Sequence, residues 1–280
     1  MAEGPIPARR SIPAGDASTS LPRVYGPGDP AATPRRSPEA ALAAASGVDG
    51  WLTDAQAGRL WSRAGAITPP GRIVEIGSYR GRSAIVLAHA AREGVEVLAI
   101  DPHAGNDRGP QEIHGTEEQG ERDNRLFKAN LERAGVSDRV RHVRLPSEDA
   151  LGEVPGEVAM VYVDGAHRYG PARDDIANWS ARLPPGGRLL VHDSYSSIGV
   201  TLALLRLLVA GRDFRYEGRD GSLAEYSRTP LSGRERAINA ARQLAQLPWF
   251  ARNVAIKLAL VARARPLARL LGHRGGHWPY

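Results

Sequence analysis

Hydrophobic runs alternate with amphipathic stretches along the chain from residue 72 to about residue 227. Short apolar runs followed by helix-forming segments predict alternating strands and helices, which is typical of a largely parallel sheet covered on both faces. The clearest helical stripe steps by three and four residues from Tyr169 through Ile176 to Leu183. The pattern predicts strands at 72–77, 95–101, 139–145, 158–164 and 188–193, and helices at 82–93, 120–134, 147–152, 169–183 and 197–210.

Further elements are expected at both ends of this alternating region. Thr53 and Gln56 have the spacing of a capping box, so a first helix is expected to begin near Thr53. Two strands near 213–217 and 222–227 would close the sheet as an antiparallel pair. The helix at 197–210 is expected to bury Ile198, Leu202, Leu205 and Leu208. We therefore expect one α/β domain over residues 46–228.

The segments outside the alternating pattern differ in composition. Residues 1–45 are rich in Pro, Ala, Gly, Ser and Arg with few large apolar residues, so we expect a disordered leader. Residues 229–280 read as a basic helical extension. The polar stretch 102–119 is too long for a simple connection and is expected to form a substrate loop or lid.

Composition narrows the class of protein. The 280 residues are 42% hydrophobic and 24% charged, which is ordinary for a soluble globular protein. The absence of cysteine excludes disulfides, thiolate metal sites and cysteine nucleophiles. No run approaches the roughly 18 apolar residues of a membrane span, and the N-terminus lacks an apolar signal segment. We expect a cytoplasmic protein.

The net charge of +6 is unevenly distributed. Residues 228–280 hold ten basic residues and one acid, Glu235, which leaves residues 1–227 at −3. Nucleic acid is not an expected partner, because aromatic residues are not interleaved with the basic ones as a stacking surface requires. Residues 232–272 could contact a membrane surface peripherally. Packing on the domain, or on a second copy in a homo-oligomer, is the other interpretation.

A glycine-spaced turn, VEIGSYRGRS, follows the first predicted strand. It carries Gly77 and Gly81, and the next strand ends on Asp101. Glycines allow a ligand to approach the backbone, and a terminal acid of this kind accepts hydrogen bonds from ribose hydroxyls. A dinucleotide site requires G-x-G-x-x-G, whereas here the spacing is wider and Tyr79 stands where a small residue is needed. The turn therefore indicates a nucleoside-containing ligand other than NAD.

Acids and histidines follow two later strands. Asp164 ends the strand at 158–164, with His167 close behind, and His192 and Asp193 end the strand at 188–193. If these strands are parallel neighbours, the four side chains converge at one sheet edge. Asp164, His192 and Asp193 could hold Mg²⁺ or another divalent cation. Alternatively His167 or His192 acts as a general base with Asp193, or the cluster is structural.

The other histidines are isolated in the sequence. His89 and His142 are expected to be structural. His103 and His114 lie in the predicted loop and are candidates for contact with a substrate.

These motifs together resemble the class I S-adenosylmethionine-dependent methyltransferases, and more narrowly the small-molecule branch known as methyltransferase domain 24. The resemblance covers about residues 50–227 and is most specific in DGAHRYGPARDDIANWSARLPPGGRLLVHDS, residues 164–194. It implies a Rossmann-like, seven-stranded, mostly parallel sheet with helices on both faces. By position it implies that Gly77, Ser78 and Ser83 meet the methionine part, Asp101 the ribose and Ser147 the adenine. Glu75, Gly81 and Asp164 are expected to complete the cofactor site.

The expected function is methyl transfer from S-adenosylmethionine to a hydroxyl of a small molecule, such as a sugar or a secondary metabolite. The catalytic candidates are His167, His192 and Asp193. Methyl transfer needs alignment, exclusion of water and removal of a proton, which suits a site with bases and no nucleophile. The alternative is a non-catalytic, methyltransferase-like scaffold that associates with a membrane surface through its basic tail.

Overall fold

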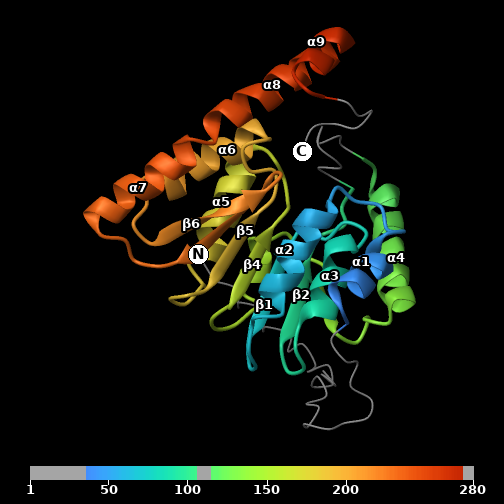
Figure 1. The fold of residues 1–280 in the computed structure, drawn as a ribbon. Coiled ribbons are helices and arrows are strands. Elements are labelled where there is room, and N and C mark those ends of the chain that lie inside the picture. The colour runs from blue at the N-terminus through green and yellow to red at the C-terminus, as the bar shows by residue number, and fades with distance from the viewer. Residues whose placement is uncertain (1–35, 106–114, 274–280) are drawn as a thin grey trace, which may run out of the picture.

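The computed structural model describes residues 36–105 and 115–273. Its centre is a seven-stranded sheet in the order β3-β2-β1-β4-β5-β7-β6 (Figure 1). β7 pairs antiparallel with β5 and β6, and every other neighbouring pair is parallel. The predicted fold class is confirmed. The strands are β1 (Arg72–Ile76), β2 (Glu96–Ile100), β3 (Val140–Val143), β4 (Met160–Val163), β5 (Arg188–Val191), β6 (Phe214–Asp220) and β7 (Leu223–Arg228).

Helices cover both faces of the sheet. Because strand side chains alternate between faces, Ile73 joins one buried cluster and its neighbour Val74 joins the other. The first cluster lies under α1 (Pro38–Ala45), α2 (Asp54–Ala64), α3 (Arg82–Ala90) and α4 (Glu117–Ala134). The second lies under α5 (Tyr169–Ser180) and α6 (Ile198–Leu204). The strand termini between these layers are the places where polar groups can gather.

The segment expected to be disordered contains a helix in its last part. α1 spans Pro38–Ala45 and is capped by the Ser37 side chain, and residues 1–35 lie outside the described residues. Ala41 and Ala45 are buried, and the helix packs against α3. The prediction failed here because it counted large apolar residues, whereas alanines let two helices approach closely.

Two helix assignments are also corrected. α4 begins at Glu117 rather than at 120, because Thr116 and Gln119 form a capping box. In α6 the expected inward residues Ile198 and Leu202 are 58% and 48% exposed. Leu208 is buried as expected and Leu205 is half-buried, while the remaining buried side chains are Val200, Thr201, Ala203 and Leu204. The segment is apolar on several faces, so its sequence alone did not fix which face packs inward.

The C-terminal helices follow one another along one side of the molecule (Figure 1). They are α7 (Gly233–Leu244), α8 (Leu247–Val261) and α9 (Arg265–Leu270). α7 is attached to the sheet edge by Asn239, whose side chain bonds the backbone of Tyr216 at 2.7 Å and of Phe214 at 3.0 Å. Within the described residues, none of the helices combines the length and apolar character needed to cross a membrane.

Candidate functional site

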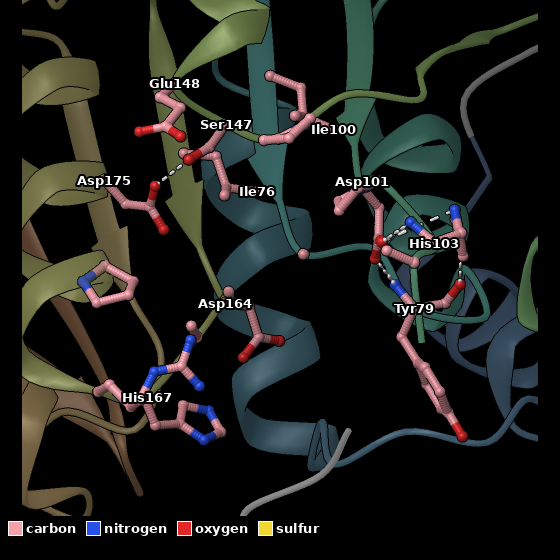
Figure 2. A pocket seen from close by; sticks show the side chains of 18 of the residues that line it. Ile76, Tyr79, Ile100, Asp101, His103, Ser147, Glu148, Asp164, His167 and Asp175 are labelled. Carbon is pink, nitrogen blue, oxygen red and sulfur yellow. Dashed lines mark hydrogen bonds and ion pairs between the residues drawn. The ribbon is translucent and has the colours of Figure 1, made fainter. Parts of the chain in front are cut away.

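A cavity of about 560 Å³ opens at the carboxyl ends of the parallel strands. This is where ligands bind in open α/β sheets, and the volume lies within the usual range for small-molecule sites. In Figure 2 Asp164 and His167 lie on one side and Asp101, His103 and Tyr79 on the other. The predicted site residues that line the cavity are Gly77, Asp101, Ser147, Asp164, His167, His192 and Asp193.

The glycine turn brings backbone to the wall of the cavity. Gly77 has φ +83°, and a Cβ there would overlap the carbonyl oxygen of Asp164. Gly81 has φ +90° and forms the N-cap of α3. Glycine is therefore required at Gly77 both by the backbone conformation and by the approach of the strand β4 terminus.

Asp101 joins the glycine turn to the end of β2. Its Oδ2 accepts hydrogen bonds from the backbone N–H groups of Ser78 at 3.0 Å and Tyr79 at 2.8 Å. Its Oδ1 accepts from the His103 backbone at 2.8 Å. The carboxylate therefore shapes the turn while it also lines the cavity.

His103 lies at the wall of the cavity rather than in an open loop. Its Nε2 lies 2.7 Å from the Tyr79 carbonyl oxygen, so that nitrogen carries the proton and donates it. The side chain is thus already engaged in holding the turn, and contact with a substrate stays a prediction. His114, the other loop histidine, lies outside the described residues.

Four predicted cofactor residues in or next to the turn do not line the cavity: Glu75, Ser78, Gly81 and Ser83. Glu75 is completely buried. Burial raises the pKa of Glu75 to about 8, the Ser83 and Ser78 hydroxyls lower it in part, and the Asp164 and Asp101 carboxylates raise it further. Direct contact of these four residues with a cofactor stays a prediction.

Ser147 is positioned by a residue that the sequence analysis missed. The Ser147 hydroxyl donates a hydrogen bond to Asp175 on α5, and Glu148 and Asp175 both line the same part of the cavity (Figure 2). Burial raises the pKa of Asp175 to about 6, and the Ser147 hydroxyl lowers it in part. Asp175 belongs to the ARDD stretch of the most specific motif, but only the tertiary structure, which brings α5 beside the loop after β3, shows its partner.

The four strand-end residues converge as predicted. His167 Nε2 lies 2.8 Å from Asp193 Oδ2, and His192 Nδ1 lies 3.0 Å from Asp164 Oδ1 and 3.4 Å from Asp193 Oδ2. The Tyr162 hydroxyl donates to Asp164 at 2.6 Å. β4 and β5 are parallel neighbours, and this pairing places the four groups at one edge.

The cluster is strongly coupled electrostatically. Burial alone would lower the pKa of His192, but the Asp164 and Asp193 carboxylates outweigh it and raise that pKa well above its usual value. Burial would also lower the pKa of His167, but the Asp193 carboxylate outweighs this effect and raises that pKa above its usual value. Burial would raise the pKa of Asp193, yet the two imidazoles hold it well below its usual range. Asp193 is therefore a carboxylate that stabilises an adjacent imidazolium.

The side chains also suit a divalent cation. One ligand atom each from Asp164, His167 and Asp193 can lie within 4.8 Å of the others. Two carboxylates and an imidazole are acceptable ligands for several divalent ions. The geometry thus groups His167, rather than the predicted His192, with the two acids. A cation there would take the place of the proton between His167 and Asp193.

Comparison with known proteins identifies the domain. Residues 74–194 match the model of a family described as a methyltransferase domain. They form a methyltransferase domain of this family. The match contains the glycine turn, Asp101, Ser147 and the whole strand-end cluster. The predicted membership in the class I S-adenosylmethionine-dependent methyltransferases is confirmed.

Individual relatives are distant. Uncharacterized protein y4gI of Sinorhizobium fredii is 29% identical over 129 residues, which are 45% of this chain and 13% of that protein's length. The structure of cofactor-bound Rv0187 from MTB is 22% identical, with a TM-score of 0.50, over 69% of this chain and 89% of that one. A Corynebacterium glutamicum protein is 15% identical, with a TM-score of 0.54, over 69% and 92%. The O-methyltransferase NovP is 18% identical, with a TM-score of 0.50, over 64% and 83%. At these identities the structures show a shared fold.

Proposed function

We propose that this protein is an S-adenosylmethionine-dependent O-methyltransferase that acts on a hydroxyl of a small molecule, such as a sugar or a secondary metabolite. The single observation that carries the proposal is one cavity lined both by the glycine turn with Asp101 and by the His167–Asp193 pair. The first part suits a nucleoside cofactor, and the second suits removal of a proton. The likeness in fold to the O-methyltransferase NovP agrees with it.

The cofactor side of the cavity suits S-adenosylmethionine. When bound, this cofactor supplies a methyl group already activated by a sulfonium sulfur. In the proposal Gly77 offers close backbone approach, Asp101 accepts from the ribose hydroxyls, and Ser147 lies beside the adenine. The acids Glu148 and Asp175 line the cavity beside Ser147 and favour a cationic cofactor.

On the acceptor side, His167 is the proposed base. Its Nε2–H donates to Asp193, so Nδ1 is the nitrogen that takes the proton from the acceptor hydroxyl. As that oxygen forms its bond to the methyl carbon, the bond from carbon to sulfur breaks and the proton remains on His167. Asp193 stabilises the imidazolium and orients the ring, and His192 in turn compensates the charge of the two carboxylates.

A divalent cation is the alternative means of activating the hydroxyl. Asp164, His167 and Asp193 would hold it, and it would lower the pKa of a bound hydroxyl. The two mechanisms make opposite demands on His167, since a cation between His167 and Asp193 would displace the Nε2 proton, whereas the base mechanism requires that proton to stay in the bond to Asp193. Calorimetric titration with Mg²⁺ separates them, because only the metal mechanism requires saturable binding that Asp164→Asn abolishes.

The decisive test begins with the cofactor. Calorimetry with S-adenosylmethionine and the intact, folded protein should show one binding site. A panel of phenols, catechols, sugars and glycosides should then release S-adenosylhomocysteine with at least one acceptor. If the folded protein binds no S-adenosylmethionine, the proposal is wrong. If it binds the cofactor but no small hydroxylated compound is methylated, a non-catalytic binding role gains support.

We also propose peripheral contact of the α8–α9 corner with an anionic membrane surface. Leu258, Val261, Leu267 and Leu270 are 65%, 72%, 49% and 83% exposed there. Beside them lie the exposed Arg263, Arg265 and Arg269. Large apolar residues together with arginines suit a headgroup boundary, whereas an isologous contact with a second copy would set like charges against each other.

Vesicle sedimentation tests this contact. Vesicles with 30% phosphatidylserine should retain the full chain, and the variant Leu258→Ser/Leu270→Ser should partition several-fold less. Ile238→Ser/Leu244→Ser, which removes exposed apolar residues of α7, is the matched control. Equal partitioning of all three proteins would contradict the proposal, and a concentration-dependent mass in light scattering would favour a homo-oligomer instead.

A further inference from the structure

The loop that carries Asp193 has an unusual backbone. Asp193 and Tyr195 have φ of +53° and +57°, in the left-handed region that non-glycine residues rarely adopt. Such a conformation persists only where surrounding contacts hold it, and it is commonest at functional sites. Asp193 is also the carboxylate that bonds His167. The contacts that hold this loop therefore determine the geometry of the proposed base.

Helix α8, far along the chain, supplies part of these contacts. The Lys257 ammonium donates to the Ser196 carbonyl oxygen at 2.9 Å and lies 3.3 Å from the Ser196 hydroxyl. The Asn253 side-chain amide donates to the Tyr195 carbonyl oxygen at 3.3 Å, and Asn253 is 2% exposed. Lys257 and Asn253 are four residues apart, so they lie on one face of the helix.

α8 is itself fixed to the domain at its N-terminal end. Trp249 and Phe250 pack against the second core cluster, and the Arg219 guanidinium lies 3.8 Å from the centre of the Trp249 ring. The helix is therefore packed against the domain where it approaches the loop. Polar side chains on such a helix can fix carbonyl groups at defined positions.

The loop also reaches His167 from its other end. The Ser197 hydroxyl donates to the His167 carbonyl oxygen at 3.2 Å, and the Ser197 N–H donates to the Asp193 carbonyl oxygen at 2.9 Å. Residues 193–197 thus connect the backbones of both members of the pair. Displacement of Ser196 or Tyr195 would be transmitted to Asp193 and to His167 together.

We infer that Lys257 and Asn253 are positioning residues, which hold the 193–197 loop so that Asp193 keeps its bond to His167. Two side chains of the C-terminal extension thus position the loop of the site. The consequence of the inference for turnover rests on the proposed function, whereas its structural content does not.

The structural content can be tested without an acceptor. In full-length protein with ¹⁵N-labelled histidine, the His167 ring signals are assigned by their loss in His167→Gln. Lys257→Met should change the ¹⁵N chemical shifts of these ring nitrogens, because the hydrogen bond from His167 to Asp193 is disturbed. Arg252→Met is the matched control, since it removes a cation on α8 that bonds the Leu271 carbonyl and not the loop. Asn253→Ala gives the same readout if Lys257→Met does not fold.

The outcomes are distinct. Movement of the His167 signals in Lys257→Met or Asn253→Ala, with Arg252→Met like the wild type, supports the inference. If every one of the variants Lys257→Met and Asn253→Ala that folds gives the same His167 signals as the wild type, the inference is wrong. With an acceptor in hand, Lys257→Met should lower kcat at least tenfold and leave KM for S-adenosylmethionine within twofold, and Lys257→Arg should restore most of kcat. A failed acceptor screen bears on the proposed function alone, because the ring signals need no turnover.

Discussion

The buried carboxyl group of Glu75 makes stability depend on pH in a way that can be worked out beforehand. Glu75 lies in the interior with a pKa of about 8, against an ordinary 4.5, because burial disfavours its charged form. A group whose pKa is raised on folding stabilises the fold fully below its unfolded pKa. That contribution is lost as the pH rises through the folded value. Glu75→Gln, which cannot ionise, removes this pH dependence.

The magnitude follows from the two pKa values. Between pH 4 and pH 7 the wild type should lose about 3 kcal/mol of unfolding free energy relative to Glu75→Gln, and by pH 9 the loss approaches about 5 kcal/mol. The quantity compared is the change in unfolding free energy with pH. The cost of burying the amide in Glu75→Gln does not depend on pH, so it cancels. The sign is opposite to that of a salt-bridged acid.

Urea denaturation at pH 4.5, 7 and 9 measures this difference. The control is Glu157→Gln, an exposed position where neutralisation should change the difference by less than 1 kcal/mol at any of these pH values. Parallel stability curves for wild type and Glu75→Gln across the whole pH range would refute the reasoning. They would mean that Glu75 ionises in the folded protein at no cost.

Three further predictions concern the site. Asp193→Asn should lower kcat about 100-fold, because a charge-assisted hydrogen bond of about 3 kcal/mol is lost and His167 adopts the wrong tautomer. Calorimetry should show an affinity for the cofactor within threefold of the wild type. Since the neutral His167 ring is the active form and Asp193 raises its pKa, the rising limb of the pH–rate curve should move to lower pH in this variant; an unmoved limb would exclude His167 as base. Gly77→Ala should abolish measurable binding of S-adenosylmethionine, because the added methyl group meets the Asp164 carbonyl, and wild-type affinity would contradict that geometry. Treatment with EDTA should leave kcat within twofold if His167 is the base, and loss of activity restored by Mg²⁺ would favour the metal mechanism.

Much of the site could be predicted from local patterns. Short apolar runs located β1, β2, β4 and β5, of which the last three end on acids, and parallel pairing then brought Asp164 and Asp193 to one edge. The same reasoning located Asp101 beside the glycine turn, where it bonds the Ser78 and Tyr79 backbone. These inferences succeeded because strand ends follow from the limits of the apolar runs, and parallel strand direction follows from the alternation of strands with helices.

Other features depend on which surfaces meet. His167 rather than His192 groups with the two acids as a candidate metal ligand, which depends on the turn after β4 and not on spacing. The partner of Ser147 is Asp175, which lies on a helix 28 residues further along. In α6 the inward face was mispredicted, because apolar residues occupy several faces of that segment.

The sequence by itself determined the order of strands and helices, the family and the strand ends at which acids and histidines gather. It could do so because hydrophobic periodicity and turn residues act over a few positions. Only the tertiary structure decided that Lys257, 61 residues after Ser196, reaches the loop of Asp193. Such a contact depends on how α8 packs against the sheet, and no local pattern in the chain encodes the angle at which one element lies across another.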